Sequence, residues 1–199
     1  MKIEFYYDFG SPNAYLVHKT LPEIAKAHGV PIVFRPILLG GVFKATNNKS
    51  PMEAFANVAG KLAYEARETQ RFVENRKIIF HPNPHFPVNT IALMRGAIFA
   101  IGKPWERSYR DTMFTATWVD QEKMDDPATV MQVMEKAGLP AKTILSATQD
   151  PSIKAALIQA TSQAVARGVF GAPTLIANDD MFFGKHSLMD LGTTPASSP

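Results

Sequence analysis

Strand-forming segments lie only near the two ends of this chain of 199 residues, and that placement limits the folds it can adopt. Residues 3–7 alternate between apolar and polar side chains with period two, which predicts a strand. A second strand is predicted at 31–39, and two short ones at 174–177 and 181–183. The region between the two pairs, 51–167, consists mainly of helix formers. We therefore expect a sheet whose two halves are far apart in sequence.

The first two strands are joined by a predicted helix at 12–27. Ser11-Pro12 is typical of a helix start, since Ser is a preferred N-cap and Pro is favoured in the first turn. Gly29 would end the helix, and Pro22 predicts a kink or a division into two pieces. A strand, a helix and a second strand of these lengths form a right-handed βαβ unit.

The middle of the chain predicts several helices, each bounded by Pro or Gly. They are expected at 51–76, 88–101, 105–119, 127–137, 141–148 and 151–167. A parallel βαβ half and an antiparallel ββ half on one sheet form the thioredoxin layout. We expect an α/β fold, namely a thioredoxin-like domain interrupted by an all-helical insertion. The expected division is 1–46 with 150–191 for the split domain, 47–149 for the insertion, and 192–199 for a polar tail.

The composition excludes several classes of function. There is no cysteine, which removes a cysteine nucleophile, a thiolate metal site and a CxxC redox pair. The net charge of +3 comes without a dense Lys/Arg run, so no nucleic-acid partner is expected. No apolar run approaches a membrane span, and the alternating start does not have the form of a signal peptide. We expect a cytoplasmic protein that binds no metal.

Ser11 lies where the first strand gives way to a helix, and it has two interpretations. As an N-cap, it would accept a hydrogen bond from a backbone N–H of the first turn. Alternatively, its hydroxyl and the helix N-terminus would together hold an anion, because unpaired N–H groups and the helix dipole favour negative charge there.

A second candidate segment, Gly171-Ala172-Pro173-Thr174, directly precedes the third strand. It is either an ordinary turn or a site at which the Ala172–Pro173 bond is cis and the backbone of Ala172 pairs with an extended peptide. Neither Ser11 nor this segment is specific alone. Their positions near the two ends of a split α/β domain predict one shared site.

The segment FYYDFGSPNAYL places Ser11-Pro12-Asn13-Ala14 where a thioredoxin has its CxxC pair. Together with FRPILLGGVFKATNNKSP, His85-Phe86-Pro87, GVFGAPT and MFFG, it resembles a family of thioredoxin-like proteins. That family includes the kappa-class glutathione transferases and bacterial 2-hydroxychromene-2-carboxylate isomerase. The resemblance covers nearly the whole chain, and LLGGVFKATNN is more similar to the isomerase branch.

The resemblance implies a glutathione-dependent isomerase that interconverts 2-hydroxychromene-2-carboxylate and trans-o-hydroxybenzylidenepyruvate in naphthalene-type aromatic catabolism. Glutathione would then supply the thiol that the chain lacks. An unperturbed thiol has a pKa of about 8.5, and a hydrogen bond from Ser11 at the helix N-terminus would favour the thiolate. The thiolate would add to the substrate, the hemiketal ring would open, and glutathione would be expelled after rotation about the former double bond.

The resemblance also suggests which residues hold the cofactor. Ala172 and Pro173 would pair with the glutathione backbone. Gly184, Lys185 and His186 stand where the family holds the γ-glutamyl end with an Asp-Arg pair, and this chain has neither Asp nor Arg there.

Four residues are candidates for substrate contact: Lys44, Asn48, Asn57 and His85. Lys44 would pair with a substrate carboxylate, or it is simply solvated. The two asparagines would otherwise lie in turns or on a helix surface. His81 and His85 are four residues apart, but the prolines between them prevent a helix, so loop packing is favoured over a metal pair.

Two further hypotheses stay open from the sequence. The chain could be a kappa-like glutathione transferase acting on an electrophilic small molecule, which would consume glutathione rather than regenerate it. It could also be a non-catalytic thioredoxin-fold binding module. The expected partners are a small aromatic carboxylate substrate and, from the resemblance, a second copy of the chain in a homodimer.

Overall fold

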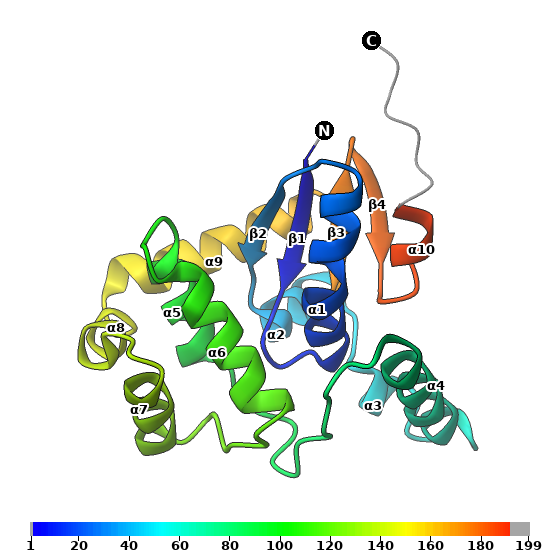
Figure 1. Cartoon of the computed structure of the whole chain (residues 1–199), viewed down its shortest axis with the longest axis horizontal. Coiled ribbons are helices and arrows are strands. Elements are labelled where there is room, and N and C mark those ends of the chain that lie inside the picture. Colours follow the sequence, from blue (N-terminus) through cyan, green and yellow to red (C-terminus); the bar gives the residue numbers. More distant parts are fainter. Residues whose placement is uncertain (1, 192–199) are drawn as a thin grey trace.

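The computed structural model describes residues 2–191, and its sheet has four strands in the order β2-β1-β3-β4 (Figure 1). The strands are β1 (Ile3–Tyr7), β2 (Ile32–Pro36), β3 (Thr174–Ala177) and β4 (Asp180–Phe183). β1 is parallel to β2 and antiparallel to β3, and β3 is antiparallel to β4. The predicted thioredoxin-like sheet is therefore confirmed. Asn178 and Asp179 both have positive φ, as a two-residue hairpin turn requires.

The helix that connects the two parallel strands is α1 (Pro12–Ala27). It starts at the predicted N-cap Ser11 and is followed by Gly29 with φ +64°. The predicted division at Pro22 is wrong, because α1 continues through this residue. Leu21 and Ala25 on either side of the proline are buried, so tertiary packing holds this part of the helix in place.

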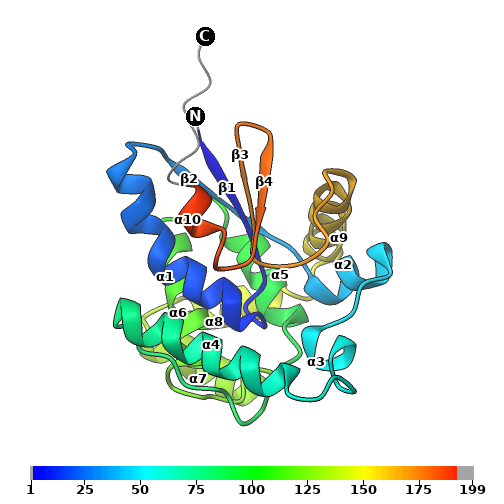
Figure 2. The same ribbon diagram turned by 90° about the vertical axis from the view of Figure 1, so that its right-hand side faces the viewer.

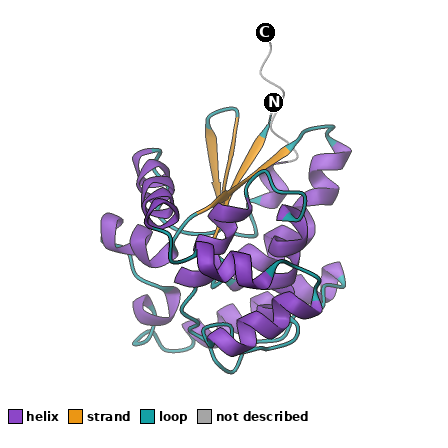
Figure 3. Ribbon diagram, turned by 90° about the vertical axis from the view of Figure 1, so that its left-hand side faces the viewer, coloured by secondary structure: helices purple, strands orange, loops and turns teal. Residues whose placement is uncertain are grey.

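Eight helices follow β2 before β3 begins, within the part of the chain that the structure describes. They are α2 (Leu39–Thr46), α3 (Pro51–Ala54), α4 (Lys61–Arg76), α5 (Ile91–Ala100), α6 (Glu106–Trp118), α7 (Pro127–Lys136), α8 (Ala141–Ala147) and α9 (Pro151–Ala166). The short helix α10 (Leu188–Leu191) follows β4. Most of these helices gather at the end of the sheet where β1 and β2 finish (Figures 1 and 3).

Several element boundaries differ from the sequence predictions. The second strand ends at Pro36 rather than Leu39, since Leu39 already begins α2. Gly41 lies inside α2, where a Cβ atom would come 3.2 Å from Thr161 of α9, so this glycine permits close helix packing. The predicted helix at 51–76 is two helices separated by a turn that ends at Gly60 with φ +77°. The insertion limits stay predictions, and the tail 192–199 lies outside the described residues.

The two faces of the sheet are covered by different helices (Figure 2). Ile3, Phe5 and Tyr7 point to the face that carries α1 and α10, and they join the larger core. Tyr6 and Ile176 point to the other face and pack in a smaller core with residues of α2 and α9. β1 is therefore buried on both sides, which fixes its direction and the position of the loop that follows it.

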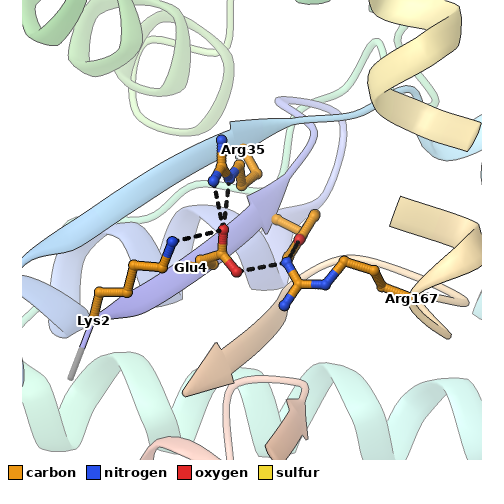
Figure 4. Close-up of polar contacts among 5 residues, drawn as sticks. Lys2, Glu4, Arg35 and Arg167 are labelled. Carbon is orange, nitrogen blue, oxygen red and sulfur yellow. Dashed lines mark hydrogen bonds and ion pairs between the residues drawn. The ribbon is translucent and has the colours of Figure 1, made fainter. Parts of the chain in front are cut away.

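Near its start, β1 is also fixed by a buried carboxylate (Figure 4). Glu4 accepts hydrogen bonds from Arg35 of β2 at 2.6 Å and from Arg167, just after α9, at 2.5 Å, while Lys2 lies 3.8 Å away. Burial alone would raise the pKa of Glu4, but the hydrogen bonds from Arg167 and Arg35 outweigh it and lower that pKa. These contacts join β1, β2 and the end of α9.

A substitution in α5 tests the close packing of the helical insertion. We expect Gly96→Ala to destabilise the protein by about 1–3 kcal/mol or more, as overpacked cores do. The new Cβ atom would lie 2.1 Å from the hydroxyl oxygen of Tyr109 in α6. This hydroxyl cannot easily move away, because it donates a hydrogen bond to the carbonyl of Leu93 in α5. The free energy of unfolding in urea measures the effect. Gly40→Ala in α2 is the control, because its Cβ atom would meet open space; an equal loss in both variants would contradict the packing argument.

Candidate functional site

Ser11 lies at the N-terminus of α1, just beyond the end of β1, and it is 5% exposed. Its Oγ accepts a hydrogen bond from the backbone N–H of Ala14 at 3.1 Å. The same hydroxyl donates to the carbonyl of Ala172 at 2.9 Å, across 161 positions of the sequence. The N-cap prediction is confirmed, and the fold brings the two segments singled out in the sequence into direct contact.

The loop before β3 contributes the second half of this site. The Ala172–Pro173 bond is cis, as one of the two interpretations of this segment expected. The carbonyl of Pro173 accepts a hydrogen bond from the N–H of Gly184 at 3.0 Å, so the end of β4 lies next to the proline. We call Ser11, Ala172, Pro173 and Gly184 the Ser11 site. Three separate parts of the sequence form it.

A buried carboxylate holds the loop that carries Ser11. Asp8 is 1% exposed and accepts hydrogen bonds from the N–H of Gly10 at 2.9 Å, the hydroxyl of Thr90 at 2.7 Å and the N–H of Leu39 at 2.8 Å. Its backbone carbonyl also accepts a hydrogen bond from the N–H of Ser11. Burial raises the pKa of Asp8, while the three donated hydrogen bonds act in the opposite direction. Asp8 thus connects the end of β1 with the starts of α2 and α5.

Next to Gly184, two of the predicted cofactor-binding residues contact a carboxylate from α4. The ammonium of Lys185 lies 2.5 Å from Glu68 Oε2, and Nε2 of His186 lies 2.6 Å from Glu68 Oε1. The side chains of Lys185 and Glu68 are 4% and 15% exposed, whereas that of His186 is 60% exposed. Burial alone would raise the pKa of Glu68, but hydrogen bonds from Lys185 and His186 lower it. We call these three residues the Glu68 cluster.

The four predicted substrate residues are less closely connected. Asn48 donates from its side chain to the carbonyl of Phe170, two residues before Ala172, so it lies beside the loop that enters the site. Lys44, Asn57 and His85 are exposed, and no contact within residues 2–191 joins their side chains to the Ser11 site. Their roles stay predictions.

Two functional candidates were missed in the sequence. Asp8 stands between two aromatic residues, directly after a predicted strand. A carboxylate in that position indicates either a turn or a buried hydrogen-bond acceptor. The sequence does not decide between these two interpretations. Glu68 carries no signal, since it is one of several acidic residues in a helix with many charges. Only the contact with Lys185 and His186 distinguishes it.

The fold and this site define a class of protein. Residues 2–193 match the DSBA-like thioredoxin domain family, so the chain belongs to that family. The fold is also that of a probable DsbA oxidoreductase from Streptomyces coelicolor, with a TM-score of 0.66, 17% identity, and coverage of 100% of this chain and 94% of that one.

Among proteins of known activity, the chain is similar to 2-hydroxychromene-2-carboxylate isomerases. It is 28% identical over 200 residues to one from Pseudomonas sp. (strain C18), with 99% of this chain and 91% of the relative covered. A solved structure of a 2-hydroxychromene-2-carboxylate isomerase has a TM-score of 0.85 and 26% identity, covering 97% of this chain and 93% of that one. Human glutathione S-transferase kappa 1 is 25% identical over 201 residues, with 92% of this chain and 85% of the relative covered. The resemblance drawn from the sequence is confirmed.

Between residues 2 and 191, no helix has both the length and the apolar character needed to cross a membrane. In the same part of the chain, no group of three or more His, Cys, Asp or Glu side chains is arranged to hold a metal ion. Nδ1 of His81, one member of the histidine pair, instead lies 2.7 Å from the carbonyl of Val119.

Replacing the Asp8 carboxylate by an amide tests whether this carboxylate holds the loop that carries Ser11. We expect Asp8→Asn to destabilise the protein by about 1–3 kcal/mol, because an amide NH₂ would face a backbone N–H and leave a buried donor unsatisfied. Chemical denaturation measures the change. Asp120→Asn is the control, since Asp120 is exposed at the end of α6. A loss in Asp8→Asn no larger than in this control would show that the carboxylate does not hold the loop.

Proposed function

We propose that the chain is a glutathione-dependent isomerase that interconverts 2-hydroxychromene-2-carboxylate and trans-o-hydroxybenzylidenepyruvate, in naphthalene-type aromatic catabolism. The observation that carries the proposal is the Ser11 hydroxyl at the N-terminus of α1, 2.9 Å from the carbonyl that precedes a cis proline. The similarity to isomerases over nearly the full length supports the choice of reaction.

The residues present fit an extended peptide that carries a thiol. The backbone of Ala172 lies two residues before β3, where a peptide in extended form could pair with it. A sulfur atom placed between Ala172 and α1 would be close to the Ser11 hydroxyl and to the N–H groups of the first helical turn. Bound glutathione would supply a thiolate that serves as nucleophile and then as leaving group, so that the net reaction is an isomerisation.

Ser11 would stabilise this thiolate by exchanging its hydrogen-bond partner. A hydroxyl has one hydrogen, so Ser11 cannot donate to Ala172 and to a sulfur at the same time. Donation to the sulfur frees the Ala172 carbonyl, which can then accept an N–H from the peptide backbone. The Ala14 N–H remains on Oγ and directs the hydroxyl hydrogen away from the helix. The helix N-terminus also favours negative charge at this place.

The remaining ligand contacts belong to the same proposal. Lys185, with three N–H donors, would contact the α-carboxylate of the γ-glutamyl end, with His186 at its rim. Asn48 would contact glutathione or substrate near Phe170, and Lys44, Asn57 and His85 would contact the aromatic carboxylate. Assembly as a homodimer and a place in the cytoplasm stay predictions from the sequence.

A kappa-like glutathione transferase is the second candidate, favoured by the similarity to human glutathione S-transferase kappa 1. The two activities differ in their products, since an isomerase returns free glutathione and a transferase consumes it. A non-catalytic binding module would show no turnover of either kind.

Removing the Ser11 hydroxyl tests its role. We expect Ser11→Ala to lower turnover by about 10²-fold or more, because a preorganised hydrogen bond to developing negative charge has that value in other enzymes. The fold should remain intact, with a loss of about 1 kcal/mol for the missing cap. The absorbance change of 2-hydroxychromene-2-carboxylate measures turnover, and circular dichroism measures folding. Ser50→Ala removes another Ser–Pro cap, at α3, and should retain activity. Unchanged turnover in Ser11→Ala would remove Ser11 from the mechanism.

Removing glutathione tests the cofactor. We expect protein freed of glutathione by dialysis to be nearly inactive, because the chain has no thiol of its own. Adding glutathione should restore turnover, and the free thiol measured after complete conversion should equal the amount added. Loss of the free thiol in proportion to product would favour the transferase, and full activity without glutathione would exclude the cofactor role.

A further inference from the structure

A largely buried histidine lies in the contact between α1 and the helical insertion. His18, two turns after Ser11 in α1, is 9% exposed. Its Nε2 atom lies 2.9 Å from Oδ1 of Asp111 in α6, which lies next to α1 (Figure 2). The ring of His18 stacks on that of Phe114 in α6, with centroids 4.8 Å apart, and it meets Phe34 of β2 at 6.1 Å. The His18–Asp111 pair therefore joins α1 to α6.

This pair fixes which ring nitrogen of His18 carries the hydrogen. A carboxylate only accepts hydrogen bonds, so the neutral imidazole carries its hydrogen on Nε2 and donates it to Asp111. Nδ1 is then an acceptor, and it is buried without a hydrogen-bond partner among residues 2–191. A second proton would have to bind to Nδ1. It would create an N–H donor without an acceptor in a largely apolar place, which is costly.

The carboxylate of Asp111 offsets only part of this cost. It would attract a protonated imidazole, but its side chain is 46% exposed, so water weakens the attraction. Its second oxygen, Oδ2, lies 3.5 Å from Nε of Arg107 in the same helix, so the carboxylate is shared with another cation.

The other groups around the ring oppose a positive charge or are apolar. Arg110 of α6 is buried, and its guanidinium lies 3.3 Å from the centre of the Phe34 ring, which also contacts His18. Glu106 reaches this guanidinium only at 3.4 Å. Arg110 and Lys19 both repel a charge on the imidazole. Burial therefore lowers the pKa of His18, although the hydrogen bond with the carboxylate acts in the opposite direction.

We propose that the His18–Asp111 pair is an acid-sensitive contact, which holds α6 against α1 while the imidazole is neutral and opens when the imidazole is protonated. The inference is independent of the proposed function. Its consequence reaches the loop that carries Ser11, because α6 ends at Trp118, whose indole N–H donates to the carbonyl of Phe9. Opening of the pair thus loosens the insertion beside this loop.

The direction of the pH effect follows from proton linkage. An unfolded histidine has a pKa of about 6.5, and the pKa of His18 in the folded protein is lower. Between the two values the unfolded chain binds more protons, so stability falls as the pH falls. Burial alone would raise the pKa of Asp111, but the hydrogen bond from His18 lowers it, so this carboxylate stays ionised over the same range. The contact is complete above about pH 6.5 and is lost as the pH falls through the folded value.

Unfolding in urea tests the pair at about pH 7.5 and about pH 5, on either side of the usual pKa of histidine. Acidification should raise the unfolding equilibrium constant of the wild type more than that of His18→Gln, by about fivefold or more, as for one unsatisfied buried donor. The Gln side chain still donates to Asp111 but does not titrate. His28→Gln is the matched control, since His28 is exposed at the end of the same helix, and it should behave as the wild type. An equal rise in the wild type and in His18→Gln would overturn the inference.

Hydrogen exchange separates a local opening from a general loss of stability, and it needs only the wild type. After correction for the intrinsic exchange rate, the amides of α6 should lose protection at about pH 5, well inside the acid range of a histidine. Those of β1 and β3 should keep theirs. A uniform loss of protection over all elements would contradict the proposal.

A second substitution tests the sign of the charge effect. Asp111→Asn keeps an oxygen that accepts from Nε2 of His18 but removes the negative charge that favours the protonated ring. We expect the loss of protection in α6 to begin at a higher pH than in the wild type. Loss of protection at the same or a lower pH would show that protonation of His18 does not open the contact.

Discussion

The hydrogen bonds of the Asp8 carboxylate hold together the part of the molecule on which the site depends. One carboxylate, almost inaccessible to water, accepts hydrogen bonds from the loop after β1, from the start of α2 and from the start of α5. Three hydrogen bonds offset part of the cost of burying this acidic group, and burial still raises its pKa. Because Thr90 belongs to the helical insertion and Leu39 to the thioredoxin-like part, Asp8 also fixes the insertion against the sheet.

The position of Ser11 follows from the hydrogen bonds of Asp8. β1 is buried on both faces and ends at Tyr7, and Asp8 then turns the chain so that Ser11 caps α1. Trp118 of α6 adds a hydrogen bond from its indole N–H to the carbonyl of Phe9, so the insertion holds this loop from a second direction. A hydroxyl held in this way can change its acceptor without moving the helix, and the proposed exchange between Ala172 and a sulfur requires that.

Helix α4 balances the charges of the segment that follows β4. The segment after β4 has two adjacent basic residues, Lys185 and His186. The fold supplies a carboxylate from α4, and burial of Phe72 at 4% exposure keeps the helix against this segment. Charge neutrality is thus achieved between two elements, and the same contacts dock α4 against the segment after β4.

The sequence by itself determined that a parallel and an antiparallel half share one thioredoxin-like sheet and that Ser11 caps a helix, and it offered the cis bond before Pro173 as one of two interpretations. Each of these depends on local periodicity or on a short motif, such as Ser11-Pro12 at the start of α1. It did not determine that α1 continues through Pro22 or that Gly41 lies inside a helix, because packing against distant residues outweighs local propensity at both positions. Only the tertiary structure decided that Asp8 is a buried acceptor and that Glu68 faces Lys185. Apart from Gly10, the partners of these carboxylates lie tens of residues or more away in the sequence, and no local pattern encodes such contacts.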